Sequence, residues 1–480
     1  MAASTEPPRA RPHPRAISRH TRLTALIVAC ALFMQNLDST VIATALPTMA
    51  RAFGSDAVRM NVALTSYLLS LAVFIPASGW VADRHGTRTV FRAAIGVFTF
   101  GSILCSIATS LPFLVAARIV QGIGGAMMVP VGRLVLLRTV AKHELVAAMA
   151  WLTVPALIGP VVGPPIGGLI VTYASWPWIF YVNVPVGLLG ILLVTLFVED
   201  VREASPGRFD LWGLLLSGIA LCGLMFGLET AGRGIVPRIA TGTMIAVGVL
   251  ASVLYWQHAR RHPRPVLDLS LLRYRTFAVS VWSGTLFRIG IGAVPYLLPL
   301  MLQLGFGQSA AASGAVTFAS AAGALVMKPV AQRALWRLGF RGTLVWNGAL
   351  SALLLGMCAG FRPGWPAVAI YAVLLAGGFF RSLQFTAYNT LAYAEIPRPR
   401  MSAATSFYAT GQQLGLTAGI SAGAAALEFA MVLHGSRTPQ LADFSFAFLA
   451  VAFVSLLASP TSALMPRDAG EELTGAKRSV

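Results

Sequence analysis

Charged residues are scarce in this chain of 480 residues: 11% are Asp, Glu, Lys or Arg, whereas 56% are hydrophobic. A soluble globular domain carries about 25% charged residues. The mean hydropathy is +0.73, and the length exceeds the roughly 250–300 residues that one soluble core absorbs. The composition therefore excludes a soluble globular protein or a disordered one. It predicts an all-α polytopic membrane protein with lipid as its solvent.

Cysteine is also sparse. The four cysteines lie singly inside apolar runs, at Cys30, Cys105, Cys222 and Cys358. This spacing suits neither a disulfide framework nor a metal site. We therefore interpret all four as packing residues.

The sequence lacks the signatures of enzymes and of ATP-driven pumps. None of its three lysines lies in a Gly-rich loop that cradles phosphates, and it has no His-Glu-x-x-His pair and no Gly-x-Ser-x-Gly elbow. His258 and His262 are four residues apart, but they flank Arg260 and Arg261, which is typical of a solvated basic loop. We therefore expect no enzyme activity, no metal and no cofactor.

Fourteen apolar stretches are long enough to span a bilayer, which takes about 20 residues. They cover roughly 23–47, 61–81, 90–108, 111–135, 145–172, 178–198, 211–230, 238–257, 276–303, 310–330, 341–361, 366–391, 401–431 and 444–464. The linkers between them are short, polar and rich in Pro, Gly and Arg. The sequence therefore predicts fourteen transmembrane helices without a large soluble insert.

Basic residues orient these stretches, because Lys and Arg concentrate on the cytoplasmic side. With the N-terminus inside, 27 of the 36 basic residues fall in cytoplasmic segments, six in outer segments and three within helices. We therefore predict that both termini are cytoplasmic, and we interpret the net charge of +19 as a topology signal and a lipid contact, not a nucleic-acid surface. A cleaved signal peptide ending at Ala43-Thr44-Ala45 is the alternative to a cytosolic tail.

Two patterns recur at nearly the same separation. Arg84-His85-Gly86-Thr87-Arg88 is followed by Arg337-Leu338-Gly339-Phe340-Arg341, and Gly159, Gly163 and Gly167 are followed by Gly411, Gly415 and Gly419. Repeated halves around a central site are a common transporter plan. We predict cytoplasmic tails at 1–22 and 466–480, six-helix bundles at 23–198 and 276–465, and two linker helices with cytoplasmic loops at 199–275.

Five motifs occur in order along the chain. They are Leu37–Pro47, Gly79–Arg88, Arg118 with Gln121–Ala126, Gly159 with Gly163-Pro164 and Gly167-Gly168, and Trp176–Phe180 with Asn183–Gly187. Together they resemble motifs of the fourteen-helix drug:proton antiporters (EmrB/QacA type) of the major facilitator superfamily, within which the MdtD-like multidrug resistance group looks closest. The resemblance implies a major facilitator fold, with two six-helix bundles plus two inserted helices, and proton-coupled multidrug efflux by alternating access. Ala43, Thr87 and Pro177 depart from the family pattern, which weakens the transfer of any particular drug spectrum.

Ionisable residues inside lipid are costly, so each requires a reason. Four are expected deep in the helices: Asp38, Arg118, Arg288 and Arg381. Counted along their helices, Asp38 and Arg118 both lie in the outer half of the membrane. A carboxylate that gains and loses an arginine neighbour would release and bind a proton. We predict proton coupling by Asp38 and Arg118; a permanent salt bridge between the two helices is the alternative.

The resemblance implies a conformational latch in the loop formed by Gly79, Asp83, Arg84, Gly86 and Arg88. We expect a turn at Gly86 and expect Asp83 to accept from the free N–H groups at the start of the next helix. The arginines are expected to pair with acids of the other half or with lipid phosphates. Topology anchoring alone is the alternative.

Two glycine strips let helices approach closely. The antiporter motif comprises Gly159, Gly163, Pro164, Gly167 and Gly168, and the matching strip comprises Gly411, Gly415 and Gly419. We predict that the two halves meet and slide along these strips. Static close packing is the alternative.

The charge balance of the expected cavity, one acid against three arginines, is unusual for an exporter of lipophilic cations. The substrate-binding candidates are Arg288, Arg381, Gln384, Tyr388 and Asn389. Arginine can hold a carboxylate with two hydrogen bonds. Drug-like neutral or cationic substrates and organic anions or their metal chelates both stay open, and proton symport is a further alternative.

The expected partners follow from this interpretation. They are a small-molecule substrate, protons and the lipids of the bacterial cytoplasmic (inner) membrane, with no nucleic acid. Whether a periplasmic adaptor takes part stays open at this point.

Overall fold

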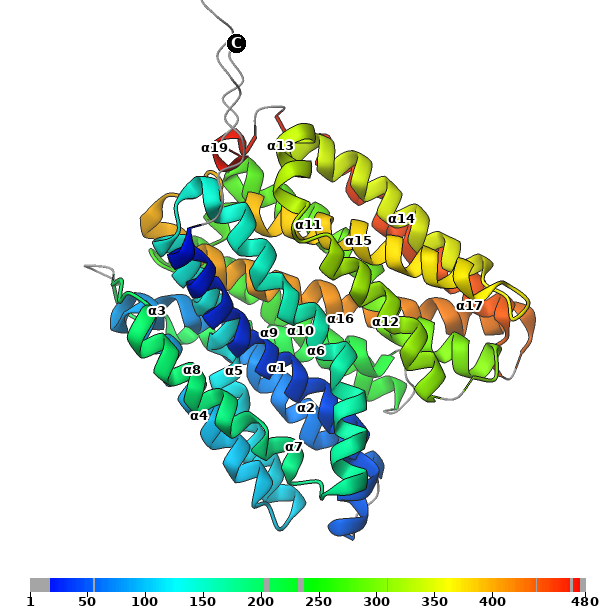
Figure 1. The fold of residues 1–480 in the computed structure, drawn as a ribbon. Coiled ribbons are helices and arrows are strands. Elements are labelled where there is room, and N and C mark those ends of the chain that lie inside the picture. The colour runs from blue at the N-terminus through cyan, green and yellow to red at the C-terminus, as the bar shows by residue number, and fades with distance from the viewer. Residues whose placement is uncertain are drawn as a thin grey trace, which may run out of the picture.

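The computed structural model describes residues 18–54, 57–202, 207–231, 237–308, 310–436, 438–466 and 469–474. In this part of the chain every regular element is a helix, and Figure 1 shows the helices packed side by side. The bounds are α1 Arg19–Ala52, α2 Ala57–Phe74, α3 Ser78–His85, α4 Thr87–Ser106, α5 Leu111–Thr139, α6 Leu145–Tyr173, α7 Trp178–Tyr181, α8 Asn183–Phe197, α9 Leu211–Ala231, α10 Arg238–Arg261, α11 Arg275–Leu300, α12 Ala310–Val326, α13 Ala331–Gly342, α14 Gly348–Met357, α15 Ala367–Leu391, α16 Met401–His434, α17 Leu441–Leu456, α18 Ala458–Ser462 and α19 Glu471–Thr474. Most of the two predicted tails lies outside the described residues.

Eleven helical stretches among the described residues are long and apolar enough to cross a membrane. Two shorter apolar stretches, Leu211–Gly227 and Ala312–Val326, occur where the sequence predicts spanning helices. The helix α6 has 29 residues and covers the predicted stretch 145–172. The prediction of an all-helical integral membrane protein is confirmed, whereas the count of fourteen spans stays a prediction.

The outer surface of the bundle is apolar. On α8, Leu188, Leu192 and Leu196 follow one another at intervals of four residues and are 60%, 54% and 63% exposed. Four-residue spacing puts the three side chains on one face of the helix. Soluble monomers rarely expose such continuous apolar surface, so this face suits lipid.

The helices that carry the two glycine strips, α6 and α16, occupy matching places in the two repeats. The helix α6 packs along α1, and α16 packs along α11. In the same way, α2 packs on α5 and α12 on α15, while α4 packs on α8 and α14 on α17. We refer to α1–α8 as the first half and to α11–α18 as the second half. This pairing agrees with the sequence repeat, and the domain boundaries themselves stay a prediction.

The helices α9 and α10 stand between the two halves in the chain. They pack mainly on each other, and α9 also contacts α2 of the first half and α16 of the second half. They therefore form a helical pair inserted between the two repeats.

One end of the bundle, which we call the terminal face, carries the start of α1 and the short helix α19. The backbone N–H of Ser18 donates to Oε1 of Glu144 at 2.8 Å, just before α6 begins. Nζ of Lys142 lies 2.7 Å from Oε2 of Glu472 in α19. Figure 1 shows α19 and α13 at this end. Both chain ends of the described part therefore meet at the same face.

Candidate functional site

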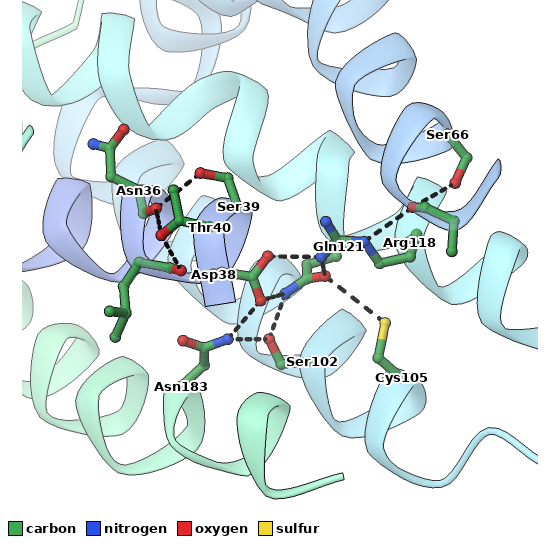
Figure 2. A network of polar contacts seen from close by, with 12 residues as sticks. Asn36, Asp38, Ser39, Thr40, Ser66, Ser102, Cys105, Arg118, Gln121 and Asn183 are labelled. Carbon is green, nitrogen blue, oxygen red and sulfur yellow. Dashed lines mark hydrogen bonds and ion pairs between the residues drawn. The ribbon is translucent and has the colours of Figure 1, made fainter. Parts of the chain in front are cut away.

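The first half encloses a buried ion pair between α1 and α5 (Figure 2). Nη1 of Arg118 lies 2.6 Å from Oδ2 of Asp38, and both side chains are at most 1% exposed. The two residues therefore meet as the sequence predicts. A pair this deep is expensive to desolvate and depends on further hydrogen bonds.

Two side-chain amides complete the surroundings of the carboxylate. Oδ1 of Asp38 accepts from Nε2 of Gln121 at 2.8 Å and from Nδ2 of Asn183, the first residue of α8, at 2.9 Å. The same two nitrogen atoms donate to Oγ of Ser102 in α4, at 2.7 and 3.2 Å. The hydrogen-bond network around this carboxylate therefore joins α1, α4, α5 and α8 (Figure 2).

Arg118 is held in place by more than its ion pair. Its Nη1 also donates to Oε1 of Gln121 at 2.5 Å, and its Nε donates to the carbonyl of Ala63 at 3.3 Å. Its guanidinium lies 4.2 Å from the centre of the Tyr67 ring. Nη2 is buried without a hydrogen-bond partner among the described residues. Because buried polar atoms are usually paired, this donor is an exception among the atoms of the network.

Local sequence explains why these side chains converge. Arg118 and Gln121 are three residues apart and share one face of α5. Gly101 permits close contact between α4 and α5, since a Cβ there would lie 2.6 Å from the Cα of Gln121. That approach brings Ser102 within reach of both amides.

Three residues of this network were not predicted as site residues from the sequence. Gln121 and Asn183 belong to recognised motifs but had no assigned role, and Ser102 lies in no motif. Polar side chains in apolar helices are the signal that marks all three.

The predicted latch loop joins the two halves at the terminal face. A Cβ at Gly79 in α3 would lie 2.6 Å from the carbonyl oxygen of Ser402 and 2.7 Å from Oγ of Ser406, both in α16. Oδ1 of Asp83 accepts from Nη2 of Arg138 at 2.6 Å, and its Oδ2 accepts from Oγ of Ser402. The loop therefore contacts α5 in its own half and α16 in the other half.

The start of α4 differs from the expectation. The turn lies at Gly86, with φ 91°, but Asp83 does not cap α4. Oδ1 of Asp200, which follows α8, instead accepts from the N–H groups of Arg88 and Thr89 at 3.1 and 3.5 Å. Burial acts to raise the pKa of Asp200, but hydrogen bonds from Arg202 and from these backbone groups hold that pKa below its ordinary value.

The two arginines of the loop do not form the expected ion pairs with protein acids. Arg84 is exposed, and neither its guanidinium nor that of Arg88 pairs with a carboxylate among the residues described. Arg138 on α5 pairs with Asp83 instead. The loop alone does not reveal this partner, because α5 is distant in the sequence.

Three glycines of the strips lie against helices of their own half. A Cβ at Gly159 would lie 2.8 Å from Cβ of Asn36 in α1, and a Cβ at Gly163 would overlap the side chain of Thr40. A Cβ at Gly419 would lie 2.9 Å from Cα of Gly292 in α11. These three glycines therefore pack inside their own halves, and sliding of the halves along the strips stays a prediction.

The other strip residues have varied surroundings. A Cβ at Gly415 would lie 3.2 Å from Cβ of Arg288 in α11. Positions Gly168 and Gly411 have open space where a Cβ would stand. Gly167 is buried, and the side chain of Pro164 lies outside the described residues.

The five substrate-binding candidates point to different neighbours. Nη2 of Arg381 donates to Oγ of Ser320 in α12 at 2.8 Å. Nε2 of Gln384 donates to the carbonyl of Leu344 at 2.9 Å. The hydroxyl of Tyr388 lies 2.8 Å from Oγ of Ser462 in α18, and Oδ1 of Asn389 is buried without a partner among the described residues. The contacts of these four side chains are mostly with other elements, and their role in substrate binding stays a prediction.

Arg288 lies between aromatic rings of the second half. Its Nη2 donates to the hydroxyl of Tyr408 in α16 at 2.5 Å. Its guanidinium lies 4.8 Å from the centre of the Tyr408 ring and 5.6 Å from that of Phe385. Its Nε is buried and has no partner in the described part of the chain.

Arg133 in α5 reaches the same tyrosine from the first half. Its guanidinium lies 5.4 Å from the centre of the Tyr408 ring and donates to the hydroxyl of Tyr393 and to Oε1 of Gln412, at 3.2 and 3.0 Å. Sequence reasoning missed Arg133, because it was counted with a cytoplasmic segment. Its position within the apolar run 111–135 is the signal that marks it.

The two arginines around Tyr408 have no carboxylate partner among the described residues. Arg133 and Arg288 are 4% and 1% exposed. Within the described ranges neither forms an ion pair with an acidic side chain. Two buried cations without a counter-ion favour the binding of an anion between them.

Known proteins of similar sequence support this picture of a transporter. The model of the Major Facilitator Superfamily matches residues 28–420. "Putative multidrug resistance protein MdtD" of Escherichia coli O17:K52:H18 is 37% identical over 464 residues, covering 96% of this chain and 98% of that protein. The protein of the same name from Shigella flexneri is 37% identical over 463 residues, covering 95% and 98%.

Two solved structures have the same fold. The proton:xylose symporter XylE bound to 6-bromo-6-deoxy-D-glucose matches with a TM-score of 0.67 at 14% identity, covering 96% of this chain and 99% of its own. The human organic anion transporter MFSD10 (TETRAN) matches with a TM-score of 0.66 at 15% identity, covering 92% and 99%. Identities this low carry information about the fold alone.

Proposed function

Because the chain belongs to the major facilitator superfamily and is therefore a membrane transporter, we propose that it exports small molecules across the bacterial cytoplasmic membrane against an inward flow of protons. The observation that carries this proposal is the buried carboxylate of Asp38, with donors from Arg118, Gln121 and Asn183. Relatives named as multidrug resistance proteins support drug-like substrates.

Asp38 and Arg118 form the proposed proton-coupling site. With Arg118 in place, three donors stabilise the charged carboxylate, and a proton bound there would displace favourable contacts. When movement of α1 against α5 withdraws Nη1, the buried charge loses its counter-ion and the carboxylate takes a proton. A permanent salt bridge, the alternative, would leave Asp38 charged throughout the cycle.

The terminal face forms the proposed cytoplasmic side. The concentration of basic residues on this side supports that orientation. Here the contacts of Gly79 and Asp83 with α16, together with the bonds from Arg133, hold the halves together. We propose that residues 23–198 and 276–465 act as the two rocking bundles, and that this loop acts as the latch of the cytoplasmic gate.

The coupling proposal is tested with purified protein in proteoliposomes that contain a pH-sensitive dye. A lipophilic cation or an organic acid is added under an imposed pH gradient. Wild-type protein is expected to move protons only with a substrate, and Asp38→Asn is expected to move none. Asp268→Asn serves as control, because this acid lies outside the network and pairs with Arg400. Proton movement at the wild-type rate in Asp38→Asn would overturn the coupling role.

Organic anions or their metal chelates are the second candidate substrate class. The observation that favours them is the pair Arg133 and Arg288 around Tyr408 without an acidic partner among the described residues. Here Arg133 takes the place expected for Arg381 as the companion of Arg288. Guanidinium groups hold carboxylates by paired hydrogen bonds.

Separate additions in the same vesicles distinguish the substrate classes. For an anion exporter, carboxylates with or without iron drive proton movement, and Arg288→Gln abolishes it. If only lipophilic cations drive it and Arg288→Gln leaves it intact, the anion class is wrong. Symport differs in direction: substrate and protons then enter the vesicle together.

A further inference from the structure

A cluster of metal-ligating side chains lies on the terminal face, away from the ion pair and from the arginines. Asp210 directly precedes α9, whereas His258 and His262 lie at the end of α10. One carboxylate oxygen and one ring nitrogen of each histidine all lie within 4.8 Å of one another. The sequence separates Asp210 from the histidines by about fifty residues, so the spacing of the histidines alone does not reveal the third group.

The three side chains are held before any ion binds. Nε2 of His258 lies 2.8 Å from Oδ1 of Asp210, and Nδ1 of His262 lies 4.0 Å from Oδ2. The two imidazole rings are stacked, with centres 5.2 Å apart. The carboxylate also accepts from the N–H groups of Gly213 and Val266, at 2.8 and 3.3 Å. Such backbone bonds orient a ligating carboxylate.

The cluster is buried on one side and open on the other. The side chain of Asp210 is 2% exposed, whereas those of His258 and His262 are 24% and 29% exposed. The histidines border a surface depression of about 360 Å³, which Leu254, Gln257 and Arg261 complete. An ion therefore has a route from solvent and room for a water ligand.

We propose that Asp210, His258 and His262 bind a first-row transition-metal ion of the Zn²⁺ class, with water at the fourth position. Bonds of about 2.0–2.1 Å to N and O donors around a tetrahedral ion put the donors roughly 3.3 Å apart. The observed separations span that value and need only side-chain adjustment. Two nitrogen donors favour Zn²⁺, Co²⁺, Ni²⁺ or Cu²⁺ over Mg²⁺ and Ca²⁺, which prefer oxygen.

Hydrogen bonds to the ligand atoms and nearby positive charges oppose the binding of an ion. The backbone N–H of Arg264 donates to Nδ1 of His262 at 3.3 Å, and the ion replaces this bond and the one between His258 and Asp210. Arg260 lies over the Trp256 ring at 3.7 Å, whereas Arg261 lines the same depression. A nearby guanidinium opposes a divalent ion, so the nitrogen ligands must supply the affinity.

Binding would connect the two inserted helices at one face. The ion would link the start of α9 to the end of α10, in place of the existing hydrogen bond between Asp210 and His258. None of the three residues takes part in the proposed proton or substrate sites. The metal proposal therefore stands or falls independently of the transport proposal.

The test uses full-length protein in detergent, with any affinity tag removed and metals stripped by a chelator. Co²⁺ is titrated while visible absorption is followed, and Zn²⁺ is then added as competitor. We expect one Co²⁺ per chain, with the absorption of a four-coordinate site that Zn²⁺ abolishes. His262→Gln keeps the bond between His258 and Asp210, so the fold is retained, and we expect affinity to fall at least tenfold. Asp210→Asn is expected to have the same effect.

His434→Gln is the matched control. His434 forms a pair with Asp443 at 2.5 Å and has no second histidine beside it among the described groups. Its removal is expected to leave Co²⁺ binding unchanged. Absence of Co²⁺ absorption in the wild type, or equal affinity in wild type and His262→Gln, would overturn the metal site.

Discussion

At the scale of single residues, the carboxylate of Asp38 has opposing requirements. It belongs to a side chain that is 1% exposed in an apolar helix, where a charge is costly, yet it has a guanidinium and two amides as donors. Removing one member of a buried ion pair is more damaging than removing both, because a lone buried charge remains. Comparing a single with a double substitution therefore separates the contribution of the ion pair to stability from that of packing.

Arg118→Leu is therefore expected to lower the free energy of unfolding by about 3–5 kcal/mol. The double variant Asp38→Leu/Arg118→Leu is expected to recover much of this loss, since no unpaired charge remains. Thermal unfolding in one detergent compares the three proteins. Equal melting temperatures for the single and double variants would contradict the ion-pair account.

The sequence predicted that Asp38 and Arg118 interact, because both are ionisable and counting along their helices puts both in the outer half of the membrane. It did not predict that Gln121, Asn183 and Ser102 share the site, because they come from three different helices. Position along a helix indicates depth, but it does not state which way a side chain points across a bundle. Only the packing of α4, α5 and α8 decides that.

At the scale of elements, the glycines of α16 differ in their surroundings: some are closely packed and one faces open space. A Cβ at Gly419 would lie 3.1 Å from the carbonyl oxygen of Arg288 and 2.9 Å from Cα of Gly292, whereas a Cβ at Gly411 meets nothing within 4 Å. Backbone contacts cannot give way as flexible side chains do. The two positions are therefore expected to respond differently to the same substitution.

Gly419→Ala is expected to destabilise the protein by about 1–3 kcal/mol through overpacking. Gly411→Ala is expected to be neutral or slightly stabilising, because alanine favours helix more than glycine. Melting temperatures in detergent check the pair. Transport by Gly163→Ala, measured beside its melting temperature, then tests whether the strips also slide: loss of transport without loss of stability would contradict static packing.

The start of α4 provides a pH-dependent element. The pKa of Asp200 lies below its ordinary value, so the charged carboxylate stabilises the fold above about pH 4, the unfolded value. At pH 7 the free energy of unfolding of the wild type is expected to be about 1 kcal/mol higher than that of Asp200→Ala. This advantage shrinks as the pH falls through the lower folded pKa.

Unfolding curves of both proteins between pH 8 and the acid limit of the detergent system measure the advantage of Asp200. The neighbouring exposed residue Glu199, changed to Ala, is the control. An advantage that grows on acidification would show that the carboxylate is not the stabilising group.

At the scale of the whole molecule, α3 and α16 hold the two halves together at the terminal face. Oγ of Ser78 lies 2.9 Å from Oγ of Ser406, and Gly79 leaves no room for a side chain against Ser402. A large residue at position 79 would overlap α16 and keep the halves apart. The contact between the halves then depends on the absence of a side chain at Gly79 as much as on hydrogen bonds.

Gly79→Leu is therefore expected to increase the labelling rate of a cysteine introduced at Ser406 and to reduce transport strongly. The background carries alanine at the four native cysteines, and a membrane-impermeant maleimide reports access. Gly96→Leu is the control, since a Cβ there meets only Ile191, at 3.9 Å. Labelling as slow as in the parent protein would rule out the proposed gate contact.

Composition and periodicity alone determined that this chain is an all-helical membrane protein, where its apolar stretches lie, and that Asp38 and Arg118 are ionisable residues at a similar depth in its helices. These are local properties, because the length of an apolar run and the cost of a buried charge are set by the residues themselves. Partnership between distant segments is not local. Tertiary structure alone decided that Gly159, Gly163 and Gly419 pack inside their own halves, that Arg138 and Asp200 contact the latch loop, that Arg133 meets Arg288 at Tyr408, and that Asp210 lies beside two histidines. Each of these contacts depends on which helix faces which.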